Sequence, residues 1–250
     1  TLQLEDAFLI NDPLVSTLSG FDHAPLLEIA VRNERRGGLP LLSGASLRGV
    51  LRTRAERIAR TLATRRWSDR DSFLAHCPAC DPMAAGRHRP VSNCDKRLAI
   101  PDTQEVPEEA LCLSCRLFGS PRRGSRLLVA DAHWQSEAPN EASSKAQDFL
   151  AIDRFTGGGQ EQAKFDAAPL IGVKFRGQIT LHNPRDWELG WLTLLLRDMA
   201  EGELTIGFGA AKGYGRVQAT DFKWTVGFIQ PADSPADASL LSDAQSNGLY

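Results

Sequence analysis

The chain has 250 residues, 42% of them hydrophobic, which is enough to bury the core of one large domain or two small ones. It contains no apolar run long enough to span a membrane, and this argues against a membrane protein. The net charge of −2 says little by itself, but eleven arginines and only three acidic residues lie between Arg32 and Arg70. Because the planar guanidinium matches the geometry of phosphate, this segment is a candidate for binding a phosphate-bearing ligand.

The N-terminal part of the chain predicts a strand, a loop and a long helix. Residues 2–10 are apolar-rich and predict the first strand, and residues 11–22 have the Pro, Gly, Ser and Asp content of a loop. A helix follows, capped by Ser43 or Ser46, with apolar residues at helical spacing on one face. Its arginines project away from that face and include Arg48, Arg52, Arg57 and Arg60. Since the N-terminal end of a helix is positive, the helix and its arginines together predict an anion site.

The middle of the chain carries two C-x2-C pairs with 31 residues between them, Cys77 with Cys80 and Cys112 with Cys115. Four thiolates suit a closed, structural zinc site in which no position is left open for water. Three further residues lie close by, and any of them could replace one of the four: His76, His88 and Cys94. The odd number of cysteines and the lack of a signal peptide argue against a secreted, disulfide-bonded protein and predict a cytoplasmic one.

The C-terminal half predicts strands around a second helix. Strand patterns cover residues 126–134, 170–182, 203–206 and 217–224, and a helical pattern covers 187–200. The order fits an α+β, ferredoxin-like (RRM-like) sheet with two large insertions. We expect this domain over residues 1–225, with a zinc-binding insertion at about 70–124 and a glycine-tipped hairpin at about 147–170. Residues 226–250 are predicted to be a linker or a disordered tail.

A glycine cluster near the C-terminus has glycines at positions 207, 209, 213 and 215. Glycine allows a backbone to approach a phosphate chain closely, Lys212 and Arg216 add positive charge, and Tyr214 offers a ring on which a base could stack. The spacing matches neither a Walker loop nor the dinucleotide fingerprint. A tight β-turn would explain the glycines alone, but together with the arginine helix they favour an extended ligand with a phosphate backbone.

Four stretches, in this order along the chain, resemble motifs of the RAMP superfamily of CRISPR proteins, and most closely the backbone subunits of type III effectors or one domain of a fused type III-E effector. The stretch LSGASLRGVLR at 42–52 is similar to the family's helix start, and CLSCRLFGS at 112–120 to its cysteine segment. IDRFTG at 152–157 resembles the start of the family's thumb hairpin, and the glycine cluster at 207–215 resembles its C-terminal loop.

The resemblance implies a domain that lies along a guide RNA and wedges its thumb into the guide–target duplex. It implies RNA contacts from Ser43, Ser46, Arg48, Arg52, Arg154, Thr156, Lys212, Tyr214 and Arg216. The family cuts RNA with an aspartate in the loop after the first strand, and GFDHAP at 20–25 matches that setting at Asp22, with His23 adjacent. Asp12 is the competing candidate. A carboxylate there could hold Mg²⁺ or take the proton of the attacking 2′-hydroxyl.

The predicted function is therefore a guide-RNA-binding backbone subunit or domain that cleaves complementary target RNA, with structural zinc, catalytic magnesium and other effector subunits as partners. Three alternatives stay open at this point. The protein could be a scaffold of the same fold that does not cut. It could be an endoribonuclease that processes guide precursors with His23 as base. It could also be a zinc-stabilised protein-interaction domain.

Overall fold

The computed structural model describes residues 1–4, 6–32, 35–66, 78–80, 94, 106–121, 123–136, 142–229 and 241–246. Its helical elements are α1 (Pro13–Ser19), α2 (Gly44–Arg66), η1 (Glu108–Ala110), α5 (Leu113–Phe118), α6 (Asp186–Ala200) and η2 (Ala210–Lys212). The strands of the N-terminal half are β1 (Leu2–Leu4), β2 (Leu27–Arg32), β3 (Arg35–Leu42), β4 (Leu127–Val129) and β5 (Ala132–Trp134). The later strands are β6 (Ser143–Ser144), β7 (Gln147–Ile152), β8 (Gly159–Ala167), β9 (Leu170–Ile171), β10 (Val173–Arg176), β11 (Ile179–Leu181), β12 (Leu204–Thr205), β13 (Arg216–Ala219), β14 (Trp224–Ile229) and β15 (Leu241–Ser246).

A seven-stranded sheet forms the centre of the molecule, with the strand order β12-β13-β1-β10-β5-β3-β2. Each pair of neighbours with a defined register is antiparallel. The short first strand β1 lies between β10 and β13, which come from the C-terminal half of the chain. The sheet is therefore complete only when residues far apart in the sequence pair with one another. A mixed α/β architecture with antiparallel sheets follows, as the sequence predicted.

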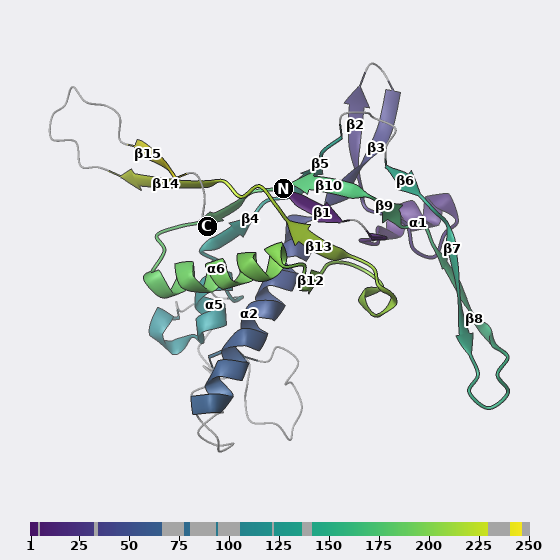
Figure 1. Ribbon diagram of the computed structural model, residues 1–250, viewed down its shortest axis with the longest axis horizontal. Coiled ribbons are helices and arrows are strands. Elements are labelled where there is room, and N and C mark those ends of the chain that lie inside the picture. Colours follow the sequence, from purple (N-terminus) through teal and green to yellow (C-terminus); the bar gives the residue numbers. More distant parts are fainter. Residues whose placement is uncertain are drawn as a thin grey trace.

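Helices α2 and α6 lie together on one side of this sheet, and α6 crosses α2 (Figure 1). Leu47, Leu51 and Ala55 of α2 and Trp191 and Leu195 of α6 join the strands in one hydrophobic core. A buried ion pair connects the two helices, because Arg54 Nε lies 2.6 Å from Asp198 Oδ2. None of the described helices is long and apolar enough to cross a bilayer.

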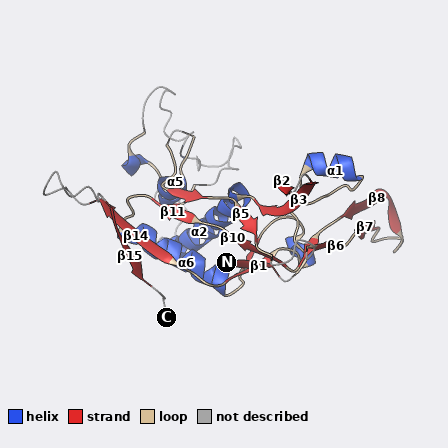
Figure 2. Cartoon of the chain, turned by 90° about the horizontal axis from the view of Figure 1, so that it is seen from above, coloured by secondary structure: helices blue, strands red, loops and turns tan. Residues whose placement is uncertain are grey.

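Two parts of the fold extend away from the core. The hairpin β7–β8, which falls within the predicted thumb at 147–170, projects from one end of the molecule (Figure 1). A second hairpin, β14–β15, projects from the other end, and Figure 2 shows it from above. Residues 224–229 and 241–246 are therefore paired strands, whereas the sequence predicted an unstructured tail from residue 226. The aromatic and β-branched residues of β14 explain the strand, since such residues favour a pleated ribbon.

The segment predicted as a plain loop at 11–22 contains the helix α1. Asp12 caps it, accepting hydrogen bonds at Oδ1 from the amides of Leu14 (2.9 Å) and Val15 (3.4 Å). Pro13 stands in the first turn, where its missing N–H costs nothing, and Gly20 ends the helix with a positive φ of 79°. Asp22 and His23 follow directly after the end of this helix.

Candidate functional site

A reciprocal pair of hydrogen bonds ties the loop that carries Asp22 to the base of the thumb. The amide of Asp22 donates to Oδ1 of Asp166 at 2.8 Å, and the amide of Asp166 donates to Oδ2 of Asp22 at 2.9 Å. The backbone of His23 continues this pairing with Asp166 and Ala168. The carboxylate of Asp22 is exposed to solvent but fixed in orientation, which is what a group acting on a bound phosphate requires.

Asp12, the competing candidate, is used differently. Its carboxylate caps α1, as described above, and its amide bonds to the carbonyl of Ala24. A cap of this kind contributes about 1 kcal/mol to a helix. The structure therefore gives Asp12 a defined architectural role, and Asp22 is the better placed of the two for chemistry.

An aromatic cluster surrounds His23 where the thumb meets the glycine loop. The His23 ring lies 4.6 Å from the ring of Phe208 and 5.8 Å from that of Phe165, between centroids. Phe165 stacks on Phe149 across the thumb at 4.9 Å. Lys212 Nζ lies over these rings, 4.1 Å from the centroid of Phe149 and 4.4 Å from that of Phe165. The rings hold the ammonium group in place by cation–π attraction, so its positive charge stays beside the Asp22 loop.

The glycines of residues 207–215 allow this loop to pack closely against the first strand region. Gly207 has a φ of 88°, and a Cβ at this position would lie 2.2 Å from the carbonyl oxygen of Leu9. The amide of Phe208 donates to that same carbonyl at 2.7 Å. Gly215 is equally confined, because a Cβ there would lie 2.0 Å from the carbonyl oxygen of Ile206. These glycines therefore serve the close approach of two backbone segments.

Tyr214 and Arg216, both predicted to contact RNA, are engaged within the protein. Tyr214 is 6% exposed, and its ring packs on Gly209 and near Phe149. Burial raises the pKa of its phenol. Arg216 donates through Nε to the carbonyl of Gly202 at 3.1 Å. Their contacts with RNA stay predictions, and the structure assigns Tyr214 a packing role.

The tip of the thumb is built around Asp153, whose Oδ1 accepts hydrogen bonds from the amides of Phe155 (2.7 Å) and Thr156 (2.8 Å). The bond from Thr156 is the largest cause that lowers the pKa of this carboxyl. The turn presents Phe155 fully exposed, at 102%, beside the exposed Arg154. An exposed apolar ring at the end of a hairpin is suited to inserting between stacked groups of a ligand.

The start of α2 is held by the loop after β4, where Asp131 Oδ1 accepts the amide of Gly44 at 2.7 Å. Ser43 precedes this first turn, and its carbonyl accepts from the amide of Leu47. Ser46 lines a groove of about 310 Å³ between α2 and β12, together with Thr53, Arg57 and Thr205. Thus Ser46 faces a space in which a ligand could lie.

The arginines Arg48 and Arg52 face the cysteine segment. Arg48 Nη2 donates to the carbonyl of Phe118, and Arg52 Nη1 donates to that of Gly119 at 3.2 Å. Burial, followed by repulsion from Arg52, lowers the pKa of Arg48. The phosphate contacts predicted for these two side chains stay predictions. In the structure both side chains join α2 to the end of α5.

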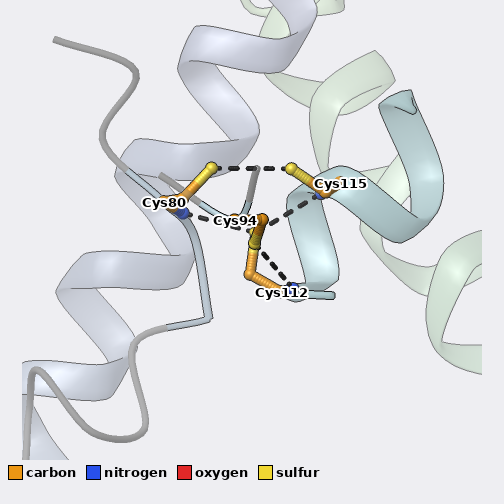
Figure 3. A group of neighbouring side chains, drawn as sticks. All are labelled: Cys80, Cys94, Cys112 and Cys115. Atoms are coloured by element: carbon orange, nitrogen blue, oxygen red, sulfur yellow. Dashed lines mark hydrogen bonds between the residues drawn. The ribbon is translucent and has the colours of Figure 1, made fainter. Parts of the chain in front are cut away.

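Four cysteine thiols meet beside α2, as Figure 3 shows. Their sulfur atoms all lie within 4.8 Å of one another, all four residues are buried, and none forms a disulfide: Cys80, Cys94, Cys112 and Cys115. Three of them are sequence-predicted ligands, and the fourth is Cys94, one of the alternatives. Cys77, the remaining predicted ligand, lies outside the described residues, as do His76 and His88.

The dimensions and the donor set of this centre fit zinc. A zinc–sulfur bond of about 2.3 Å in a tetrahedron places sulfur atoms about 3.8 Å apart, and Cys80 and Cys115 are 3.5 Å apart here. Backbone amides donate to two of the sulfurs, from Cys80 to Cys112 and from Cys112 to Cys94, each at 3.3 Å. Such donors stabilise thiolates.

The crowding of the thiols also favours a cation. Hydrogen bonds from the neighbouring thiols, Cys112 first, lower the pKa of Cys80, and a bond with Cys112 lowers the pKa of Cys94 to about 7. Hydrogen bonds with the same neighbours, Cys112 first, raise the pKa of Cys115, and repulsion from the negative charge of Cys112 raises it further. A divalent ion removes that repulsion and lets all four thiols ionise.

The structure combines an antiparallel sheet, two helices that cover it, a cysteine centre on one flank and a projecting hairpin on the other. This combination defines a class of α/β proteins. The model of the RAMP superfamily matches residues 24–218. The chain therefore belongs to the RAMP superfamily. The comparison with curated proteins gave no match.

Among solved structures, the chain is similar to one from a structure titled "Type IV-B CRISPR Complex". The TM-score is 0.54 at 16% sequence identity, and the match covers 95% of this chain and 96% of the other. At this identity the likeness concerns the fold.

Sequence reasoning missed the residues that connect the site. Asp166 and the rings of Phe149, Phe165 and Phe208 were not singled out, although Phe149 and Phe165 are cross-strand partners in the thumb. The apolar run of β7, from Phe149 to Ile152, could have drawn attention to the ring at position 149. Nothing in the local sequence indicates that Asp166 would meet Asp22, since 144 residues separate them.

Proposed function

We propose that this protein is a backbone subunit or domain of a CRISPR effector, that it binds guide RNA, and that it cleaves complementary target RNA beside Asp22. Membership in the RAMP superfamily and the fold likeness to a chain of a CRISPR complex support the first part. Cleavage beside Asp22 is supported by the fact that three segments far apart in the sequence lie together. They are the Asp22 loop, the base of the thumb at Asp166 and the glycine loop at Lys212. Assignment to type III rests on the sequence motifs.

The central strands also support a ferredoxin-like core. The strands β13, β1, β10 and β5 are adjacent in that order, and α2 and α6 follow β1 and β10 along the chain. This is the order expected of a β-α-β-β-α-β unit. In this reading β2–β3, the cysteine segment and the thumb are additions to that unit.

The proposed reaction needs few groups. The 2′-hydroxyl of the target attacks its own phosphate when the backbone is held in line, which forms a 2′,3′-cyclic phosphate and releases a 5′-hydroxyl. Asp22 takes the proton or holds a magnesium ion at the phosphate. Lys212, fixed over the phenylalanine rings, supplies positive charge beside the phosphates. The imidazole of the adjacent His23 assists the proton transfer in this proposal; its Nδ1 is buried and has no hydrogen-bond partner among the described residues, so this nitrogen is not the one that reaches the RNA.

The cysteine centre is proposed to hold one structural zinc ion through Cys80, Cys94, Cys112 and Cys115. All four positions of a tetrahedron are then protein ligands, so the ion supplies folding energy and takes no part in cleavage. Free thiols persist in a reducing compartment, and on this basis we propose a cytoplasmic location.

The test separates cutting from binding. The effector is assembled with labelled target RNA and Mg²⁺, using wild-type protein, Asp22→Ala or the control Glu201→Gln, an exposed acidic residue after α6. We expect Asp22→Ala to abolish the one cut beside this subunit and to leave target affinity equal or slightly higher, because a carboxylate repels phosphates. The control should keep the complete fragment ladder.

An unchanged ladder for Asp22→Ala would contradict the catalytic role and favour the scaffold function. Cleavage of free guide precursor without metal, lost in His23→Ala, would favour the processing function. Failure of the wild-type protein to bind RNA at moderate salt would leave the protein-interaction function.

A further inference from the structure

The cysteine centre is held against α2 by one face of that helix, on which charged residues recur at every fourth position: Arg48, Arg52, Glu56 and Arg60. Residues four apart lie on the same side of a helix. Arg60 Nη2 donates to the carbonyl of Cys80 at 2.7 Å, and Arg52 Nη1 donates to that of Gly119. The arginines that the sequence assigned to an RNA-binding face therefore contact both halves of the cysteine segment.

Glu56 lies at the centre of these contacts, and its side chain is buried, with only 6% of the residue exposed. Its Oε1 accepts from Arg52 Nε at 2.9 Å and from the hydroxyl of Ser114 at 2.7 Å. Its Oε2 lies 3.4 Å from Arg60 Nη2. A buried carboxylate is costly unless it is paired and hydrogen-bonded, and here it has both kinds of partner. Glu56 thereby fixes the direction in which the guanidinium of Arg52 points.

Arg52 points at a sulfur atom. Its Nη2 lies 3.5 Å from Sγ of Cys115, one of the four candidate ligands. Four thiolates around a divalent ion leave a net charge of about −2 on the centre. A guanidinium donating to one of these sulfurs offsets part of that charge in a buried place where water cannot do so.

We propose that Arg52, oriented by Glu56, is a positioning residue of the metal centre that offsets the charge of its thiolates and couples metal binding to the docking of α5 on α2. The proposal rests on the zinc site proposed above, and it is independent of RNA cleavage. Outer-shell partners of this kind typically change metal affinity by about 10- to 100-fold when removed.

The test compares purified Arg52→Met with wild-type protein and with Arg65→Met, which removes an exposed arginine from the same helix. Zinc affinity is measured by competition with a chelating dye, and the thiolate-to-metal absorption is recorded after loading with Co²⁺. We expect Arg52→Met to bind zinc at least about tenfold more weakly and to shift the Co²⁺ absorption. Arg65→Met should match the wild type in both measurements.

The variant Arg52→Lys separates the effect of the positive charge on zinc affinity from the effect of side-chain packing. Lysine keeps the positive charge but lacks the fork that contacts Glu56, Gly119 and Cys115 together, so an affinity between those of wild type and Arg52→Met is expected. If Arg52→Met has a lower unfolding temperature but an unchanged zinc affinity and Co²⁺ spectrum, its role is structural only and the proposal is wrong. A lysine variant no better than methionine would contradict the charge-offsetting role. Wild-type protein that binds no zinc would overturn the metal site together with this proposal, whatever the outcome of the RNA cleavage assay.

Discussion

The sequence around Asp22 is enough to single it out as a candidate catalytic residue. The residue that fixes its orientation, Asp166, cannot be recognised from the sequence. Asp166, the partner of Asp22, lies at the base of the thumb, and their mutual hydrogen bonds depend on a long-range contact. Local patterns report which residue types are present, whereas pairing across 144 residues depends on the whole fold. The same reason explains why Tyr214, which looks like a stacking residue in sequence, is buried among other rings.

If the proposed cleavage takes place beside Asp22, removing the side-chain acceptor of Asp166 should impair it without impairing the binding of RNA. In Asp166→Ala the amide of Asp22 loses its partner and the loop is less well fixed. We expect the single-turnover cleavage rate to fall by about tenfold, which corresponds to about 1.4 kcal/mol in the barrier. Asp166→Asn keeps an oxygen in the Oδ1 position and should stay close to wild type. Equal rates for both variants would show that the pair does not orient the loop.

The fourth metal ligand can be decided by two single substitutions. The sequence favours Cys77 because of its C-x2-C spacing, while the structure brings Cys94 to the other three sulfurs. We expect Cys94→Ser to lower the zinc content measured by elemental analysis, since it removes a thiolate from the centre. Cys77→Ser should retain one zinc ion per chain. The reverse result would restore the set of ligands predicted from spacing.

At the level of elements, the sequence predicts the two long helices well because each has an apolar face with a helical period. The strands were harder to predict. Residues 35–42 form β3, although the segment begins with two arginines and two glycines, a composition that is typical of a turn. Six of its residues have partners in β2. Tertiary pairing outweighs weak local propensity in this hairpin. The helix α1 was missed although Asp12 and Pro13 carry its start signal, because its seven residues are too few for a clear period.

The contact between α2 and α6 gives a pH-dependent prediction. Asp198 is buried; burial alone would raise its pKa, but hydrogen bonds from Arg197 and Arg54 outweigh this and lower it. A carboxyl whose pKa is lowered by folding stabilises the protein above its unfolded pKa of about 3.9 and loses this effect as the pH falls through its folded value. Asp198→Asn should therefore reduce the free energy of unfolding at pH 7 by about 1–3 kcal/mol.

Urea unfolding at several pH values checks this prediction. The difference between wild type and Asp198→Asn should shrink as the pH falls below about 4, because there the unfolded state takes up a proton at this carboxyl before the folded state does. Asp186→Asn, at the exposed start of the same helix, is a suitable control. A difference that is constant with pH would mean that the substitution acts through packing and not through charge.

At the scale of the whole molecule, the described core consists of two hydrophobic clusters. The larger one unites the central sheet with α2 and α6, and the smaller one contains the four cysteines with Val106 and Leu111. The two meet through α5, whose Leu117 and Phe118 belong to the larger cluster while Cys115 belongs to the smaller. Figure 1 shows α5 and the thumb on opposite sides of α2. The proposed metal site thus belongs to a different cluster from the central sheet.

Removing the metal should consequently unfold one unit and spare the other. After treatment with a strong chelator at pH 7, we expect hydrogen exchange to increase in residues 106–115, because the thiolates repel one another once the cation is gone. The amides of β1, β10 and β13 should remain protected, since their core contains no thiolate. Exchange of the backbone amide of Asp166, which bonds to Asp22, should be unchanged as well. Uniform loss of protection throughout the chain would instead mean that the two clusters fold as one cooperative unit, and that the cysteine centre supports the proposed cleavage site directly.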